Sequence, residues 1–216
     1  MEIYRADQPS ERALALASAA AAVCHGEVIC LPTDTVYGIG ADPYNADAVT
    51  ALLAAKSRTR AMPPPVLVPN WEVGRQLIAW HPAQAESLIE AYWPGALTLI
   101  FPARQSVGWD LGETNGTVAL RIPDHPVALE LLGETGPLAV TSANKTGEPP
   151  ASTIENAVSQ LGDAVAVYID AGGAPGGVPS TILRFDPEHD GVAELVREGA
   201  IAPADIERVS HLEVRG

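Results

Sequence analysis

The sequence is poor in cysteine and contains no long apolar run. Its two cysteines, Cys24 and Cys30, are not accompanied by a cluster of further cysteines or histidines, so we predict two free thiols rather than a zinc site or a disulfide framework. No apolar stretch approaches the roughly 18 residues that a membrane-spanning helix needs. The first residues, MEIYRADQPSER, lack the pattern of a signal peptide. We therefore expect a cytoplasmic protein that makes no contact with a membrane.

Lysine is also scarce, and acidic residues outnumber basic ones. The 216 residues include 13 Lys and Arg against 27 Asp and Glu, which gives a formal net charge of −14. Nucleic acid repels a chain of this charge unless the few cations cluster. Three of them do cluster, because Lys56, Arg58 and Arg60 fall within five residues. The position of these few cations therefore decides which anions the protein can bind.

Several common catalytic motifs are missing. There is no G-x-x-x-x-G-K-[ST] phosphate loop, no H-E-x-x-H and no G-x-S-x-G. Gly38-Ile39-Gly40 is followed by Pro43 where the dinucleotide fingerprint needs glycine. The five histidines are scattered, and His125 in PDHP is the least unsuitable of them for catalysis. A Walker-type ATPase, a dinucleotide enzyme and a catalytic triad are thus without support.

Strand-like and helix-like patterns alternate along the chain, which predicts a single α/β domain over residues 1–216. No internal repeat, linker or low-complexity tail divides it. Helices are predicted at 10–24, 45–58, 71–92 with a break at Pro82, 126–132 and 203–209. Strands are predicted at 28–31, 66–68, 97–101, 118–122, 138–141, 165–169, 180–185 and 192–196, the last two as a hairpin.

Four polar segments lie at or near the ends of apolar strands, where α/β sheets commonly bind ligands. The first, residues 32–40 (PTDTVYGIG), combines small hydroxyls with glycines and fits either a ligand-binding loop or a plain turn. The second, residues 56–60 (KSRTR), leaves the end of a helix. Its cations suit a polyphosphate, but they also suit the negative end of a helix dipole.

The other two segments are equally ambiguous when each is taken alone. In residues 117–123, Arg121 interrupts an apolar strand, so it pairs either with an internal carboxylate or with a substrate carboxylate or phosphate. Residues 141–147 (TSANKTG) can present backbone N–H groups to an anion, although Ser-Ala-Asn is also ordinary turn chemistry.

Taken together and in this order, the motifs of the chain resemble those of the YrdC-like family. They are PTDTVYG at 32–38 for P-T-[DE]-T-x-Y-G, KSR at 56–58 for K-x-R, WPGALT at 93–98 for W-P-G-P-L-T, RIP at 121–123 for R-x-P, TSAN at 141–144 with Gly147 for [TP]-S-A-N-x-S-G, STI at 180–182 for S-T-[IV], and REG at 197–199 for R-x-G. Each motif alone is weak, but seven in register make coincidence very improbable. The resemblance covers about residues 10–202.

The resemblance implies a fold, an activity and partners. The fold is a single α/β domain with a twisted mixed β-sheet, flanked by helices around a concave basic cavity. The activity is threonylcarbamoyl-AMP synthesis from ATP, bicarbonate and L-threonine, with release of pyrophosphate and with Mg²⁺ on the ATP phosphates. The product supplies the threonylcarbamoyl group for adenosine 37 of tRNAs that read codons starting with A. Downstream threonylcarbamoyl-transferase proteins are then expected as partners, and direct contact with tRNA is only weakly indicated.

The resemblance also implies a role for individual residues. Lys56 and Arg58 are expected to face the ATP phosphates and to act in catalysis. The rest of the ATP site is expected to comprise Thr117, Ser142, Asn144 and Arg197. L-Threonine is expected to bind Thr35, Arg121 and Ser180, with Arg121 pairing with the threonine carboxylate.

The sequence departs from the family pattern at several positions. Thr59 stands where the family often has proline, and Leu67 where many members have a histidine near threonine. Lys145-Thr146 replaces an apolar residue followed by serine. The second C-terminal domain of some members is not expected here.

Two other functions remain as alternatives. The first is a non-catalytic RNA-binding paralogue of the same fold, against which the net charge of −14 and the intact set of nucleotide-site residues both argue. The second is a carbamoyl-transfer module like that of hydrogenase maturation proteins. The complete form of those proteins is excluded because it carries cysteine-rich zinc fingers and this chain has only two cysteines.

Overall fold

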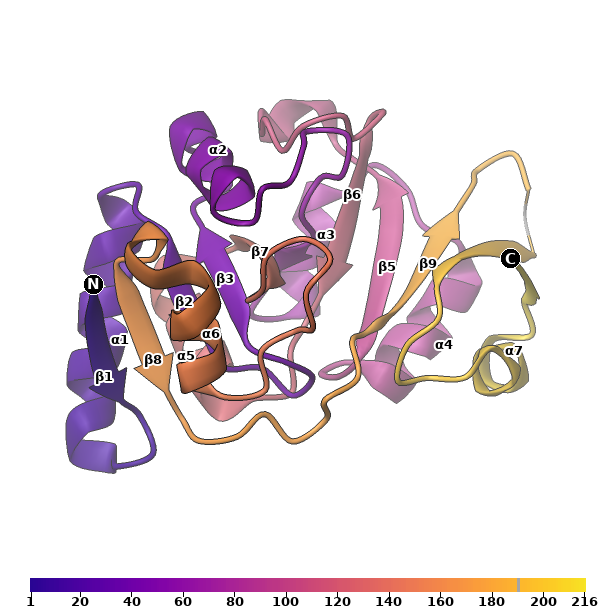
Figure 1. Ribbon diagram of the computed structural model, residues 1–216. Helices are drawn as coiled ribbons and strands as arrows, with labels where there is room; N and C mark the ends of the chain where they lie inside the picture. Colours follow the sequence, from indigo (N-terminus) through magenta and orange to yellow (C-terminus); the bar gives the residue numbers. More distant parts are fainter. Residues whose placement is uncertain (190) are drawn as a thin grey trace.

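A single mixed sheet runs through the computed structural model, which describes residues 1–189 and 191–216. Within these residues the strands follow the order β1-β8-β2-β3-β7-β4-β6-β5-β9-β10-β11. Their bounds are β1 (Glu2–Arg5), β2 (Ile29–Leu31), β3 (Gly38–Ala41), β4 (Val66–Leu67), β5 (Leu97–Pro102), β6 (Thr117–Arg121), β7 (Leu138–Ser142), β8 (Val167–Asp170), β9 (Thr181–Phe185), β10 (Val192–Arg197) and β11 (Glu213–Arg215). The N- and C-terminal strands, β1 and β11, form the two opposite edges (Figure 1).

Helices flank both faces of this sheet. They are α1 (Pro9–Cys24), α2 (Ala46–Ala55), α3 (Trp71–Leu77), α4 (Ala83–Tyr92), α5 (Pro126–Thr135), α6 (Ile154–Leu161) and α7 (Pro203–Ser210), with 3-10 turns η1 (Gln105–Val107) and η2 (Gly162–Ala164). Their ends follow local chemistry. Proline occupies the first turn of α1, α5 and α7, where no amide hydrogen is needed. Asn45 caps α2 by accepting hydrogen bonds from the amides of Asp47 and Ala48.

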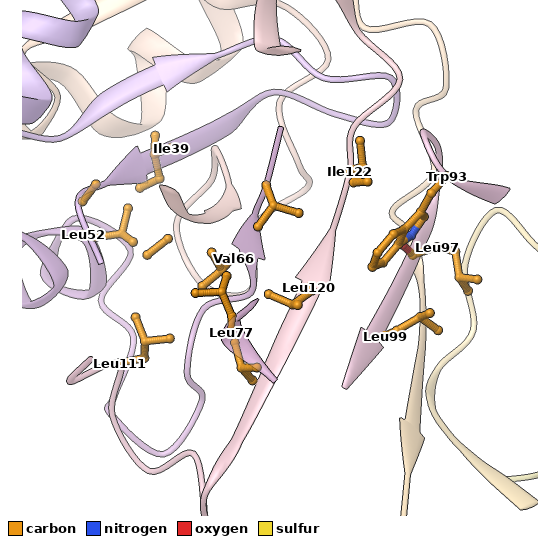
Figure 2. Close-up of a cluster of buried hydrophobic side chains, with 14 of the residues drawn as sticks. Ile39, Leu52, Val66, Leu77, Trp93, Leu97, Leu99, Leu111, Leu120 and Ile122 are labelled. Atoms are coloured by element: carbon orange, nitrogen blue, oxygen red, sulfur yellow. The ribbon is translucent and has the colours of Figure 1, made fainter. Parts of the chain in front are cut away.

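The sheet separates two apolar clusters. On one face, α1 and α5 pack against each other and cover β8, β2 and β7. The opposite face carries the larger cluster, to which α2, α3, α4, α6 and α7 contribute side chains. Figure 2 shows part of it, with Val66, Leu120 and Leu99 projecting from the neighbouring strands β4, β6 and β5.

Strand alternation determines where the functional cavity lies. In β6, Val118 and Leu120 are buried in the larger cluster, so the alternate residues Thr117, Ala119 and Arg121 face the other side. Neighbouring strands β5 and β9 alternate in the same way. On the face that bears α1 and α5, the side chains of β4, β6, β5 and β9 therefore border a cavity instead of a helix.

The centre of the sheet is its narrowest connection. β4 has only two residues and pairs antiparallel with β7 and parallel with β6. Two flanking hydrogen bonds extend it, from the Val140 amide to the Pro65 carbonyl (2.8 Å) and from the Val68 amide to the Arg121 carbonyl (2.9 Å). We call residues 65–68 the seam, because they join the β1-to-β7 half of the sheet to the β6-to-β11 half.

The predicted α/β fold, with a mixed sheet flanked by helices, is confirmed. The strands and helices predicted from the sequence are all present, with end shifts of a few residues, and β9 and β10 form the expected antiparallel hairpin. Among the strands and α-helices of the described residues, β1, β3, α6 and β11 were not predicted, and neither were the 3-10 turns η1 and η2. Cys24 and Cys30 are free thiols as expected. None of the helices in the described residues is both long and apolar enough to cross a bilayer.

Candidate active site

A cavity of about 410 Å³ opens over the exposed part of the sheet. Its wall combines the ends of strands with the segments that follow them. The polar lining includes Thr33, Thr35, Arg58, Thr98, Glu113, Thr114, Asn115, Thr117, Arg121, Thr141, Ser142, Ser180, Arg184 and Arg197. Four arginines and one carboxylate thus border it, although the protein as a whole is strongly acidic.

Arg121 lies at the bottom of this lining and is held on three sides. Its Nε donates to the Gly95 carbonyl (2.8 Å), Nη1 to Thr35 Oγ1 (3.0 Å) and Nη2 to Asp34 Oδ1 (2.5 Å). The Arg121 and Asp34 side chains are only 8% and 14% exposed. Burial lowers the pKa of Arg121, and the Asp34 carboxylate opposes that shift. Such an ion pair is strongly held, because removing one partner would leave a buried charge uncompensated.

Arg58 and Arg197 present a different electrostatic situation. Arg58 donates from Nη1 to Thr141 Oγ1 (3.0 Å), while its Nε is buried with no hydrogen-bond partner. Arg197 donates from Nε and Nη2 to the Ser180 carbonyl (3.0 and 2.7 Å). Their hydrogen-bond partners within the described residues are neutral, so both positive charges lack an internal counterion.

The three guanidinium groups lie close enough to influence one another. Burial lowers the pKa of Arg197, and the positive charges of Arg121 and Arg58 lower it further. Burial also lowers the pKa of Arg58. Of these three arginines, only Arg121 is paired with a carboxylate, and the fourth arginine of the lining, Arg184, is paired with Glu194 (3.0 Å). Among the described lining residues, Arg58 and Arg197 are therefore the arginines without a paired carboxylate, and an anionic ligand would neutralise them.

Small hydroxyls fix the remaining polar wall. Ser180 Oγ shares a hydrogen bond with Thr98 Oγ1 (2.8 Å) and accepts another from Arg197 Nη2 (3.0 Å). Thr35 Oγ1 shares one with Thr33 Oγ1 (3.0 Å) while accepting from Arg121. The hydroxyls thus hold each arginine in its own hydrogen-bonded group: Arg121 with Thr35 and Thr33, Arg197 with Ser180 and Thr98, and Arg58 with Thr141.

Lys56 lies behind the cavity wall rather than on it. It follows α2 directly and is only 3% exposed. Its Nζ donates to the carbonyls of Ser142 (2.5 Å) and Asn144 (2.6 Å) and to Asn144 Oδ1 (3.0 Å), with Ser142 Oγ at 3.3 Å. Burial, followed by the charge of Arg58, lowers the pKa of Lys56 to about 8.

Asn144 is likewise fully used in internal contacts. Its Nδ2 donates to the carbonyls of Lys145 (2.9 Å) and Glu148 (2.7 Å). The Lys56 carbonyl in turn accepts from the amide and the hydroxyl of Thr146 (3.0 and 2.9 Å). These contacts tie the end of α2 to residues 142–148.

Of the nine residues predicted from the sequence, seven come together on the wall: Thr35, Arg58, Thr117, Arg121, Ser142, Ser180 and Arg197. Lys56 and Asn144 are not among the described residues that form the wall, but both contact Ser142 or its neighbours from behind. The predicted assignment of individual residues to ATP or to threonine stays a prediction.

Sequence reasoning missed several residues of the site. Asp34 lies in the first motif, but nothing in the sequence indicates its partner. Thr98 lies in the WPGALT motif and Thr141 in TSAN, so membership of a motif is the signal that could have found them. Arg184 and Glu113 lie outside every motif, and only the fold brings them to the cavity.

A long connection closes one side of the cavity. Residues 171–180 run from β8 in one half of the sheet to β9 in the other (Figure 1). The Gly177 amide donates to the Thr35 carbonyl (2.8 Å), and a Cβ on Gly176 would lie 2.6 Å from the Asp34 carbonyl oxygen. The end of this connection packs as tightly on the segment that follows β10, because a Cβ on Gly199 would lie 2.4 Å from the Pro179 carbonyl oxygen.

The lining offers little to a metal ion held by protein alone. Glu113 is the one carboxylate among the lining residues that the structure describes. No group of three or more His, Cys, Asp and Glu side chains suited to a metal occurs in residues 1–189 and 191–216. Mg²⁺ prefers several oxygen ligands in octahedral geometry, so a dedicated protein site does not fit here, whereas Mg²⁺ arriving on nucleotide phosphates is compatible with the lining.

Comparison with known proteins shows which family and which relatives this chain resembles. The model of the Sua5, YciO and YrdC family, described as "Telomere recombination", matches residues 21–199. A protein of Mycobacterium tuberculosis is 50% identical over 211 residues, which are 98% of this chain and 94% of that protein. A threonylcarbamoyl-AMP synthase of Bacillus subtilis is 38% identical over 196 residues, 90% of this chain but only 56% of the longer relative.

Solved structures agree with the fold. The Pyrococcus abyssi Sua5 protein complexed with L-threonine superposes with a TM-score of 0.91 at 28% identity, and the match covers 100% of this chain and 63% of that chain. The E. coli YciO structure gives a TM-score of 0.79 at 23% identity, covering 93% and 95% of the two chains, and so supports the fold alone.

Proposed function

Since the chain belongs to the Sua5, YciO and YrdC family, we propose that it is a threonylcarbamoyl-AMP synthase, which joins L-threonine, bicarbonate and ATP and releases pyrophosphate. The observation that carries this proposal is the division of charge in one cavity. Arg121 is neutralised by Asp34, whereas Arg58 and Arg197 have only neutral partners. One cavity thus offers a neutral hydrogen-bonding site beside a positively charged one, which suits an amino acid beside a polyphosphate.

The chemistry needs positioning and charge neutralisation rather than a covalent nucleophile. The threonine amine attacks CO2, which bicarbonate supplies with loss of hydroxide; a new N–C bond forms and the amine loses a proton, which leaves a carbamate. A carbamate oxygen then attacks the α-phosphorus of ATP, a new P–O bond forms, the bond to the bridging oxygen breaks, and pyrophosphate leaves with that electron pair. Arg58 and Arg197, which both line the cavity, would neutralise phosphate charge as it shifts to the leaving group.

The amino acid is assigned to the opposite part of the lining. Arg121 would hold the threonine carboxylate, with the hydroxyls of Thr35 and Ser180 beside it. Thr117 and Ser142 would border the nucleotide. Lys56 and Asn144 complete the nucleotide site of the proposal, and Lys56 fixes the carbonyls of Ser142 and Asn144 on which the shape of that wall depends. Mg²⁺ would enter as part of the ATP complex and neutralise phosphate charge.

The proposal extends to the use of the product. Threonylcarbamoyl-AMP would supply the group placed on adenosine 37 of tRNAs that read codons starting with A, through a separate transferase protein. The net charge of −14 favours transfer of the small product over direct binding of tRNA by this chain.

The decisive test is pyrophosphate release from MgATP and bicarbonate, measured with and without L-threonine. We expect release that depends on threonine in the wild type, and losses of at least about 100-fold in Arg58→Ala and Lys56→Ala, because each removes a charge from the nucleotide side. Arg208→Ala is the matched control, since Arg208 is exposed on α7 and forms an ion pair with Asp205. Folded wild-type protein that releases no pyrophosphate but binds RNA would instead establish the non-catalytic paralogue.

A further inference from the structure

The first polar motif contains a carboxylate with no assigned role in the reaction. Asp34 lies between Thr33 and Thr35, and its Oδ1 accepts hydrogen bonds from Arg121 Nη2 (2.5 Å) and from the Asp124 amide (3.1 Å). Asp34 is not part of the cavity wall among the described residues, so it acts on a ligand only through Arg121.

Arg121 retains limited capacity for a ligand. A guanidinium carries five N–H donors, and three of these are used by the Gly95 carbonyl, Thr35 Oγ1 and Asp34 Oδ1. One N–H therefore remains on each terminal nitrogen. Two donors match the two oxygens of a single carboxylate, but they match one edge of a phosphate equally well. Hydrogen-bond geometry alone does not tell the two ligands apart.

The charge of the Arg121 subsite does distinguish an amino-acid carboxylate from a phosphate. The Arg121–Asp34 pair has no net charge, whereas Arg58 and Arg197 are uncompensated. An amino acid is a zwitterion without net charge, so binding beside a neutral ion pair costs it little electrostatic free energy. A phosphate group carries roughly −1.5 to −2 near neutral pH, and in a partly buried site it is repelled by the nearby Asp34 carboxylate.

We propose that Asp34 is a selectivity residue, which neutralises Arg121 so that the Arg121 subsite accepts the amino-acid carboxylate and rejects the phosphates bound by Arg58 and Arg197. This inference rests on the proposed function, because it assumes that both ligands enter the same cavity. Without Asp34, Arg121 would join Arg58 and Arg197 as an arginine without a carboxylate partner, and a polyphosphate could occupy the threonine subsite.

The variant Asp34→Asn separates charge from geometry. Asparagine keeps an Oδ1 that can accept from Arg121 and from the Asp124 amide, but it removes the negative charge. Asp205→Asn is the matched control, because Asp205 pairs with Arg208 at the exposed start of α7. Asp34→Glu keeps the charge with a longer side chain.

The probe is methylenediphosphonate, a non-hydrolysable pyrophosphate analogue, and threonylcarbamoyl-AMP formation is followed chromatographically. In the wild type and in Asp205→Asn, we expect inhibition that is relieved by ATP but not by L-threonine. In Asp34→Asn, L-threonine should also relieve it, with the inhibition constant for the threonine subsite lower by at least about tenfold. Asp34→Glu should behave like the wild type.

Each outcome has a defined meaning. The selectivity role is overturned if L-threonine relieves the inhibition by methylenediphosphonate in the wild type. It is equally overturned if L-threonine does not relieve this inhibition in Asp34→Asn. If Asp34→Asn forms less product but keeps the wild-type pattern of inhibition and relief, Asp34 has a structural role only, and this also overturns the proposal. If Asp34→Asn does not fold, the pair Asp34→Glu and Asp34→Gln provides the same charge contrast at equal length. Absence of threonine-dependent product in the wild type would instead refute the proposed function.

Discussion

At the scale of single residues, the cations on and behind the cavity wall differ in how their charge is compensated. Arg121 has a carboxylate, Arg58 and Arg197 have neutral acceptors, and Lys56 is surrounded by carbonyl and side-chain oxygens. The sequence predicted that these four residues act on anions. It could not predict which of them is neutralised internally, because Asp34 and Arg121 are 87 positions apart and only the fold brings them together.

The lowered pKa of Lys56 makes stability depend on pH. Its pKa is about 8 in the folded chain against an ordinary value of 10.5, so the unfolded chain binds more protons between these limits and the free energy of unfolding rises with pH there. Between pH 7.5 and 9.5 the wild type should gain about 2 kcal/mol relative to Lys56→Met, measured by urea unfolding. The chain has one other lysine, and Lys145→Met, at an exposed position, should track the wild type. Parallel curves for wild type and Lys56→Met would contradict this prediction.

At the scale of elements, segments with a long, regular hydrophobic pattern were predictable, whereas a glycine-rich strand and short edge strands were not. Helix α1 and strands β5 and β7 combine long patterns with clear ends, and they appear as predicted. β3 (GIGA) has glycines where a strand normally has branched side chains, so the sequence favoured a turn. Its glycines are explained by packing, since a Cβ on Gly38 would lie 2.8 Å from Val140 Cγ1. β1 and β11 are short edge strands, and the partner of β1, strand β8, lies far along the chain.

Gly199, just after the end of β10, and Gly133, in α5, provide a paired glycine test. A Cβ on Gly199 would lie 2.4 Å from the Pro179 carbonyl oxygen and 2.5 Å from the Ser180 carbonyl carbon, both backbone atoms that cannot rotate away. Gly199→Ala should therefore displace Ser180 from Arg197, destabilise the protein by about 1–3 kcal/mol and raise the KM for ATP. Gly133→Ala, in the exposed part of α5 with no atom within 4 Å, should stabilise the fold by about 0.5–1 kcal/mol and leave KM unchanged. Equal effects of the two substitutions on KM would refute the packing argument.

The start of α2 provides a test of stability without loss of function. Asn45 Oδ1 accepts from the amides of Asp47 and Ala48, both at 3.1 Å, at the end of the helix remote from Lys56. Asn45→Ala should lower the free energy of unfolding by about 1 kcal/mol in urea titrations. The KM for ATP should stay within about twofold of the wild type, because the cap does not touch the cavity. A large change in KM would show that the cap controls the position of Lys56.

At the scale of the whole molecule, the few cations are concentrated in the cavity of an acidic protein. Four of the 13 basic residues line it, while the chain carries a net charge of −14. The cluster of cations at 56–60 predicted this concentration of positive charge in an acidic chain. Arg60, however, pairs with Asp110 outside the cavity wall. Two other cations of the wall, Arg184 and Arg197, come from the hairpin of β9 and β10. Assembly of the cavity depends on contacts between distant strands, which no local pattern specifies.

This charge distribution predicts poor binding of tRNA. At 0.15 M salt we expect dissociation constants at or above the non-specific range of roughly 10⁻⁴–10⁻⁶ M, because the outer surface repels phosphates and the cavity is small. Fluorescence anisotropy with labelled tRNA would measure this, with ATP as competitor. Tight binding that ATP displaces would show that the cavity itself accepts RNA.

The seam at residues 65–68 links ligand binding to the cohesion of the molecule. Thr35, Arg58 and Ser142 belong to one half of the sheet and Thr117, Arg121, Ser180 and Arg197 to the other, yet only a two-residue strand joins the halves at the centre. A ligand that contacts both sets bridges the seam and opposes its separation. At a ligand concentration 100 times the dissociation constant, this protection amounts to about 2.7 kcal/mol. Amide hydrogen exchange at Val68 and Val140 should then slow together, so that occupancy of the cavity determines how long the two halves stay joined.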